Sequence, residues 1–166
     1  ERGHALNTAR LLAAGLVNAE LHVVERISID SALHAQLVDG SRRTELLFPG
    51  AESSLLTMPL EDLRPHQLVL LDGTWRKARK LLHVNPVLRT LPQVSLSPGL
   101  RSRYRLRKAP GPGALSTIEA GAAALQLLEP DRDFQPLLRP FDRLIEEQIQ
   151  AMGAERYQRN YGKGQT

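Results

Sequence analysis

The stretch Leu68-Val69-Leu70-Leu71-Asp72-Gly73-Thr74-Trp75-Arg76-Lys77-Ala78-Arg79-Lys80-Leu81-Leu82 determines how the rest of the chain is interpreted. Four consecutive apolar residues are typical of a strand buried on both faces, as in a parallel sheet. Asp72 then lies at the carboxyl end of that strand, where open α/β sheets bind their ligands. Gly73 permits a tight turn, and either Asp72 or Thr74 can cap the helix predicted from Trp75. This strand end is therefore the first candidate for a functional site.

Working outward, the remaining segments predict an α/β fold with a mostly parallel sheet flanked by helices in a single domain. Helices are expected over residues 5–17, 31–37 (capped by Asp30), 75–82, 117–128 and 134–152, with a further turn at 87–91. Strands are expected at residues 44–50, 67–71 and 93–96, and a strand-like alternation of arginines covers 101–107. Residues 21–24 form either a short strand, which is favoured, or a connector. The tail from residue 154 is basic and polar and is expected to be frayed.

Composition and charge limit the possible partners. The chain has 166 residues, of which 42% are hydrophobic, and this is sufficient for a core. No apolar stretch approaches the roughly eighteen residues of a membrane span. The chain has no cysteine and no predicted leader, so we expect no thiolate metal site and a cytoplasmic location. The five histidines have no ligand spacing, and no metal is expected.

Basic residues are clustered at 76–80 and 101–108 in a chain with a net charge of +4. Clustered arginine and lysine are typical of a polyanion partner, so nucleic acid is the favoured interpretation and a solvated surface the alternative. Arg101, Arg103, Arg105 and Arg107 recur at every second position. In a strand they form one row, which makes them the better phosphate-binding candidate.

Four sequence blocks resemble a known family. Leu71-Asp72-Gly73-Thr74-Trp75 resembles the D-x-T-W signature that names the DTW-domain family. Asn7-Thr8-Ala9-Arg10-Leu11, Leu46-Leu47-Phe48-Pro49-Gly50 and Ser116-Thr117-Ile118-Glu119-Ala120 are similar to three further blocks in the family's order. Phe141-Asp142-Arg143-Leu144 and Glu147-Gln148-Ile149 also fit. The resemblance covers nearly the whole chain, with residues 1–153 as the DTW domain and 154–166 as a basic tail.

The resemblance implies a tRNA-uridine aminocarboxypropyltransferase. Such an enzyme transfers the 3-amino-3-carboxypropyl group of S-adenosylmethionine to N3 of a tRNA uridine and releases 5'-methylthioadenosine. It also implies a SPOUT-like fold with a trefoil knot, tRNA as partner and no membrane. A monomer is the expected state, although SPOUT relatives are commonly dimers. Family members often carry a Cys-rich, zinc-binding segment ahead of the first block; this chain has no cysteine. The alternatives are a SPOUT-type RNA methyltransferase that uses S-adenosylmethionine and a non-catalytic RNA-binding module.

The same resemblance assigns expected roles to residues. Asp72 is the candidate base for the uridine N3 proton, or a group that orients the uracil edge. The residues expected to hold S-adenosylmethionine are Leu47, Phe48, Pro49, Gly50, Asp72, Gly73, Thr74, Trp75, Leu115, Ser116, Thr117 and Glu119. The residues expected to contact RNA are Asn7, Thr8, Arg10, Arg76, Lys77, Arg101, Arg103, Arg105 and Arg107.

Several of these roles have a structural alternative. Trp75 either stacks on a base or packs in the core. Glu119 either accepts from the ammonium group of the substrate or is placed in a helix first turn for its favourable interaction with the helix dipole. The helix start at Ser116 and Thr117 would favour a carboxylate. Arg10 contacts either the carboxylate of S-adenosylmethionine or an RNA phosphate, or it forms a salt bridge inside the fold.

Overall fold

The computed structural model describes residues 7–58, 62–106 and 114–161 of the chain. It divides into two compact units, one formed by Glu1–Ala19 with Pro98–Thr166 and the other by Glu20–Ser97. Within the described ranges, all strands lie in the Glu20–Ser97 unit. The fold is α/β, as the sequence predicts. None of the helices in these ranges is long and apolar enough to cross a membrane.

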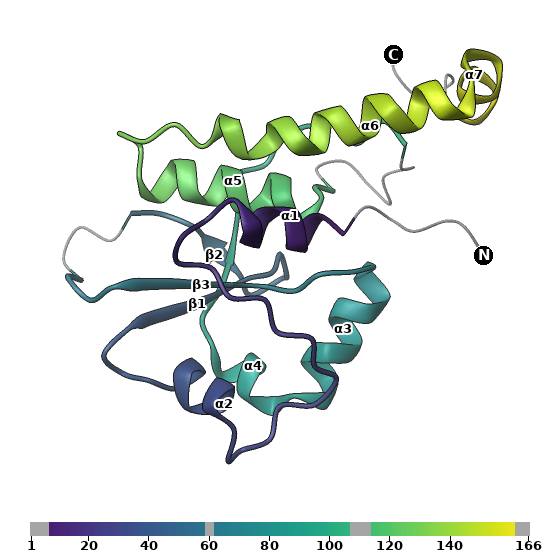
Figure 1. The fold of residues 1–166 in the computed structure, drawn as a ribbon. Helices are drawn as coiled ribbons and strands as arrows, with labels where there is room; N and C mark the ends of the chain where they lie inside the picture. Colours follow the sequence, from purple (N-terminus) through teal and green to yellow (C-terminus); the bar gives the residue numbers. More distant parts are fainter. Residues whose placement is uncertain (1–6, 59–61, 107–113, 162–166) are drawn as a thin grey trace. The chain divides into compact units, whose positions relative to one another are not determined.

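The Glu20–Ser97 unit is built on a small, entirely parallel sheet (Figure 1). Its strands are β1 (Arg43–Leu47), β2 (Ser54–Leu55), β3 (His66–Leu70) and β4 (Gln93–Ser95), in the order β2-β4-β1-β3. β1 and β3 pair in register from Arg43 opposite His66 to Leu47 opposite Leu70. The two strands therefore end level with each other, and their following loops leave the same edge of the sheet. The short strand β2 is not among the predicted strands.

Residues 21–24 form the connector that was the alternative and not the favoured strand, and the backbone that follows them is held by Asn85. This side chain is 2% exposed; it accepts a hydrogen bond from the Ile27 amide (2.7 Å) and donates to the Glu25 carbonyl (3.1 Å). It also donates to the Leu81 carbonyl at 2.9 Å. The backbone at 25–27 is thus bonded to the end of a helix, while Leu21, Val23 and Val24 just before it are exposed.

Three helices accompany the sheet in the described part of this unit: α2 (Ala32–Leu37), α3 (Trp75–Val84) and α4 (Pro86–Thr90). The cap of α2 is Ser31, whose side chain accepts from the His34 amide, and not Asp30 as predicted. The turn predicted at 87–91 is helix α4. A buried cluster joins α2, β1 and α4, and its members are Leu37, Leu46, Val87, Leu88 and Leu91.

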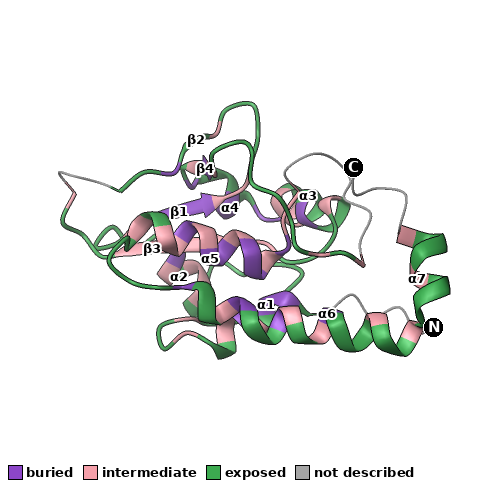
Figure 2. Cartoon of the chain, turned by 90° about the horizontal axis from the view of Figure 1, so that it is seen from above, coloured by how far each residue is buried: buried purple, intermediate pink, exposed green. Residues whose placement is uncertain are grey.

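The other unit is helical, with α1 (Thr8–Ala14), α5 (Thr117–Leu128), the 3-10 turn η1 (Gln135–Leu138), α6 (Arg139–Met152) and α7 (Ala154–Tyr161). Figure 2 shows buried residues on α1 and α5, whereas α7 is largely exposed. α1 approaches α5 closely at Gly121, where a Cβ would lie 2.3 Å from Leu12 Cδ2. The part of the tail that the structure describes, residues 154–161, is helical and not frayed as expected, and residues 162–166 lie outside the described residues.

Candidate active site

Two of the predicted blocks meet at the carboxyl edge of the sheet. Because Leu47 and Leu70 are register partners, residues 48–50 and 71–75 follow adjacent strands from the same level. The rings of Phe48 and Trp75 make an edge-to-face contact, with centroids 5.6 Å apart and planes at 63°. Phe48 also packs against the buried cluster of this unit. The contact supports a packing role for Trp75, and stacking on a ligand stays a prediction.

The turn from Asp72 to Trp75 has a backbone that only glycine adopts easily. Gly73 has φ of +121°, a conformation that L side chains rarely adopt. Thr74 is the N-cap of α3, and its side chain accepts from the Lys77 amide at 3.3 Å. Of the two capping candidates, Thr74 is therefore the cap residue. Asp72 is exposed just beyond the end of β3.

The loop after β1 has its own hydrogen bonds. The Phe48 amide donates to the Val94 carbonyl at 2.9 Å. The Gly50 amide donates to Ser53 Oγ at 3.2 Å, and the Ser53 hydroxyl donates to the Gly50 carbonyl at 2.8 Å. Since Pro49 has no N–H, the amide donors of residues 48–50 are used inside the protein. A ligand at this wall would therefore be recognised by side chains and carbonyl groups.

In the helical unit, the predicted residues at the start of α5 form a capping box. Ser116 is its N-cap, and Glu119, at 6% exposure, accepts from the Ser116 amide (2.8 Å) and hydroxyl (2.6 Å). The Glu119 carboxylate also accepts from the Ser102 hydroxyl (2.9 Å) and the Arg103 amide (2.5 Å). These bonds support the first-turn alternative for Glu119. Contact with S-adenosylmethionine stays a prediction for Glu119 and for the half-buried Leu115 and Thr117.

The strand predicted for the arginines at 101–107 is wrong. Residues 101–106 form irregular structure, and Arg107 lies outside the described residues. Arg103 pairs with Asp142 at 3.1 Å and donates to Gln135 at 2.9 Å, while Arg105 pairs with Glu146. Two of the predicted phosphate-binding guanidinium groups are therefore engaged by α6 and its preceding turn. Arg101 is exposed.

The other predicted RNA contacts differ in their availability. Arg76 and Lys77 are exposed on α3. Asn7 is the N-cap of α1, where its side chain accepts from the Arg10 amide at 3.1 Å, and Thr8 is buried. The structure therefore gives Asn7 and Thr8 folding roles. The side chain of Arg10 is exposed.

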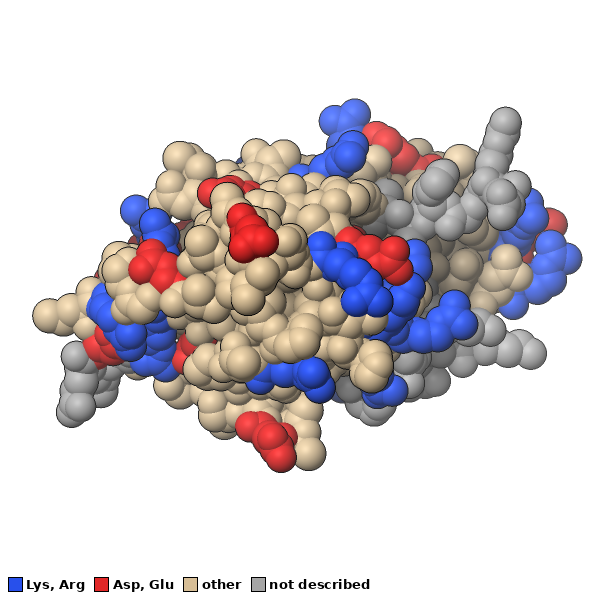
Figure 3. All heavy atoms as spheres, turned by 90° about the horizontal axis from the view of Figure 1, so that it is seen from below, with Lys and Arg blue, Asp and Glu red and all other residues tan. Residues whose placement is uncertain are grey.

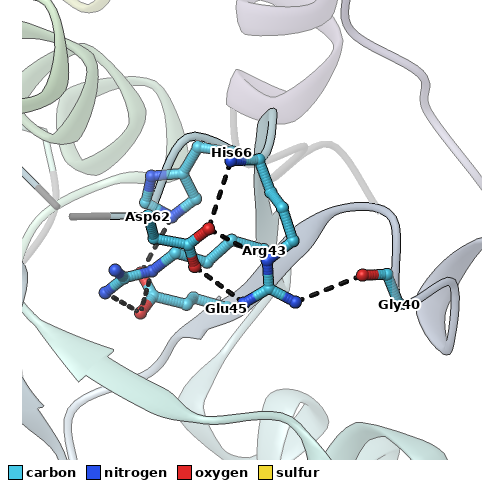
Figure 4. Close-up of polar contacts among 6 residues, drawn as sticks. Gly40, Arg43, Glu45, Asp62 and His66 are labelled. Carbon is cyan, nitrogen blue, oxygen red and sulfur yellow. Dashed lines mark hydrogen bonds and ion pairs between the residues drawn. The ribbon is translucent and has the colours of Figure 1, made fainter.

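A buried charged cluster, which the sequence interpretation missed, lies near the amino ends of β1 and β3 (Figure 4). Glu45, at 4% exposure, accepts from Arg43 at 2.7 and 3.0 Å, and its other oxygen lies 2.8 Å from His66 Nε2. His66 Nδ1 is buried without a hydrogen-bond partner among the described residues. The available signal was two charged residues at i and i+2, Arg43 and Glu45, in a strand that ends in two leucines. Since Asp72 follows the carboxyl end of β3, the cluster is at the other end of the strands.

Asp62, which lies beside this cluster in Figure 4, is half-buried and forms an ion pair with the exposed Arg64. Arg64 donates to Asp62 at 2.7 and 2.9 Å and to the Gly40 carbonyl at 3.2 Å. The hydrogen bonds from Arg64 lower the pKa of the Asp62 carboxyl to about 2. In the part of the chain that the structure describes, no group of three histidine or acidic residues could hold a metal ion.

Comparison with known proteins adds a family and several relatives. A family model described as the DTW domain matches residues 1–149. A mouse protein named tRNA-uridine aminocarboxypropyltransferase 2 is 32% identical over 166 residues, covering 97% of this chain and 56% of the relative. Proteins of the same name from Macaca fascicularis and Drosophila melanogaster are 33% and 34% identical, covering 90% of this chain and 52% and 61% of their own lengths. The chain spans about half to three fifths of these relatives. No solved structure matches it.

Proposed function

This chain belongs to the DTW-domain family, and from that premise we propose that it transfers the 3-amino-3-carboxypropyl group of S-adenosylmethionine to N3 of a uridine in tRNA. The observation that carries the proposal is the match of almost the whole chain to relatives named tRNA-uridine aminocarboxypropyltransferase 2. The convergence of the blocks at 48–50 and 72–75 on one sheet edge supports it, because open α/β sheets bind ligands there.

The reaction forms one nitrogen–carbon bond, breaks one carbon–sulfur bond and moves one proton from N3 to a base. Uridine N3 loses its proton to a base and attacks the γ-carbon of the aminocarboxypropyl group. The bond from that carbon to sulfur breaks, and its electron pair stays on the sulfur, so the sulfonium becomes the neutral thioether of 5'-methylthioadenosine. The protein must therefore provide a proton acceptor and hold N3, carbon and sulfur in line.

Asp72 is the residue that we propose as the proton acceptor or as the group that orients the uracil edge. It is an exposed carboxylate held by a turn of restricted conformation at the ligand-binding edge. Phe48 and Trp75 supply aromatic surface beside it, suited to an adenine or uracil ring. The start of α5 at Ser116 and Thr117 is the proposed position for the substrate carboxylate, since helix amino termini favour anions.

The finer features of the fold are part of the same proposal. We expect the SPOUT-like arrangement with a trefoil knot, because the family is related to that class, and an experimental structure of the chain tests it. The small parallel sheet is compatible with this arrangement. A cytoplasmic location and a monomeric state are likewise proposed.

The proposed function is tested with tRNA and S-adenosylmethionine labelled separately in the methyl and carboxypropyl groups. Transfer of the carboxypropyl label to RNA supports the proposal. Transfer of the methyl label would replace it with a methyltransferase, and RNA binding without any transfer would leave a binding module. Asp72→Asn should abolish most of the transfer. Asp30→Asn, which changes an exposed acid in the same unit outside the site, should leave transfer unchanged.

A further inference from the structure

We propose that the α3 basic face, made up of Arg76, Arg79 and Lys80 with Lys77 at its edge, binds the phosphates of the RNA substrate in preference to the arginines at 103 and 105. The inference rests on the proposed function, which supplies RNA as the partner. It concerns which surface carries the electrostatic part of binding, because phosphate contacts determine the position of an RNA and much of its affinity.

The sequence of α3 places these cations on one side. Arg76, Arg79 and Lys80 are three and four residues apart, so they share a side of the helix, and His83 continues it by another turn. The buried residue Ala78 lies on the opposite side. The cations are exposed, and α3 contains no acidic residue. The helix therefore packs by one side and presents a basic side to solvent.

The charges of this face are mostly unneutralised. Lys80 pairs with Glu25 at 2.5 Å. Among the described residues, no acid forms an ion pair with Arg76, Lys77 or Arg79. Like charges at helical spacing repel one another by a few tenths of a kcal/mol per pair. A bound polyanion would neutralise these cations and remove that repulsion, so the arrangement fits a surface that binds a polyanion. Figure 3 shows basic side chains gathered in separate groups, with acidic residues beside several of them.

The arginines at 103 and 105, in contrast, are each paired with an acidic residue. Each guanidinium faces a carboxylate of α6, Asp142 for Arg103 and Glu146 for Arg105. A phosphate at either one would have to displace that partner or accept its repulsion. The alternation seen in the sequence therefore does not produce a row of free cations, whereas the α3 basic face does.

The position of α3 in the chain connects this face to the candidate site. The helix begins at Trp75, three residues after Asp72, and the turn between them has the restricted backbone of Gly73. Arg76 and Lys80 are separated by about 6 Å along the helix axis at 1.5 Å per residue. An RNA held along this face would thus have its backbone fixed next to the carboxylate that we propose acts on the uridine.

The test measures tRNA binding directly, without transfer, by fluorescence anisotropy at several salt concentrations. The α3 variant carries Arg76→Gln, Lys77→Gln and Arg79→Gln. A control variant with the same change in net charge carries Arg42→Gln, Arg89→Gln and Arg139→Gln, all exposed positions outside α3. A third variant carries Arg103→Gln and Arg105→Gln. Thermal unfolding of each variant verifies that it is folded.

The loss of three phosphate contacts should reduce the slope of log K against log salt by about 2 to 3. At 0.15 M salt this corresponds to binding weakened by up to about a hundredfold. The control and the Arg103/Arg105 variant should bind tRNA within about threefold of the wild type. An α3 variant with the affinity and salt slope of the wild type would overturn the inference while leaving the proposed function intact. A wild-type chain that neither binds nor modifies tRNA would overturn both.

Discussion

The conformation of Gly73 leads to a prediction that links the backbone of the site to its activity. Substituting Gly73→Ala adds a Cβ whose nearest contacts are Lys77 Cβ at 3.4 Å and Cδ at 3.5 Å, ordinary van der Waals distances. Space therefore does not limit the substitution. The cost comes from φ of +121°, which alanine adopts only with strain.

The expected change in the free energy of unfolding of Gly73→Ala is the difference of two effects. Holding a non-glycine residue in a sparsely populated backbone region costs about 1–3 kcal/mol. Alanine also restricts the unfolded chain, which stabilises the native state by about 0.4–1 kcal/mol. The free energy of unfolding should therefore fall by about 1–2 kcal/mol. If the turn instead relaxes to negative φ, Asp72 moves relative to Trp75, and a displacement of about 1 Å can reduce the transfer rate by roughly a hundredfold.

Two control glycines separate these effects, measured by urea unfolding and by the labelled transfer assay. Gly153 has φ of +83° with nothing within 4 Å of the position that an added Cβ would take, so Gly153→Ala should destabilise similarly and leave transfer unchanged. Gly40 has open space and no positive φ, so Gly40→Ala should be neutral or slightly stabilising. Equal stability of Gly73→Ala and Gly40→Ala would refute the backbone argument. Full transfer activity in Gly73→Ala would show that the turn is not part of the site.

Three further predictions concern the Glu20–Ser97 unit. Thr44→Val should raise the free energy of unfolding by about 1 kcal/mol, because Thr44 Oγ1 is buried without a partner in the described structure. A free energy of unfolding below that of the wild type, measured with urea, would contradict this. Glu45→Ala should lower the same free energy by about 3 kcal/mol, because it removes the buried carboxylate that the half-buried Arg43 and His66 share, and a change below about 1 kcal/mol would argue against the cluster. The pKa of Asp62, about 2, should return towards 3.8 in Arg64→Gln, as measured by NMR titration. Since the folded pKa is lowered, the stabilisation by this pair is present above pH 3.8 and is lost as the pH falls towards 2.

Local sequence patterns predicted helices and strands correctly where the interactions that form them are also local. The apolar run at 68–71 correctly predicted a strand, but β3 is a half-buried edge strand and is not buried on both faces as predicted. The cap chemistry around Thr74 predicted the start of α3 at the correct residue. The capping box at Ser116 and Glu119 is a short-range pattern that the structure contains. The absence of polar alternation predicted a mostly parallel sheet, and the structure adds the pairing of β1 with β3, which places two of the predicted blocks together.

The failures involve partners distant in the sequence. Alternation alone predicted a strand at 101–107, but Arg103 is engaged by Asp142, 39 residues away, and Arg105 by Glu146, 41 residues away. The apolar segment at 21–24 precedes backbone that is bonded to Asn85, at separations of 58 and 60 residues. A periodicity reports which side chains share a face, and it does not report which acid or amide from another element faces them.

The hydrogen bonds of Glu119 indicate whether its place in the sequence block at 116–120 requires a catalytic role. Its carboxylate receives donors from Ser102, Arg103 and Ser116, and the side chain is 6% exposed. To accept from a substrate ammonium group as well, it would have to give up one of these bonds or release the segment at 102–103. Folding alone therefore accounts for an acid at this position, since without it the Ser116 amide and the Arg103 amide would lose their acceptor. Asp72 differs from Glu119 in burial, because it is exposed beyond a strand end, and Thr74 caps the helix that follows. The chemistry of the proposed transfer thus depends first on the turn at 72–75.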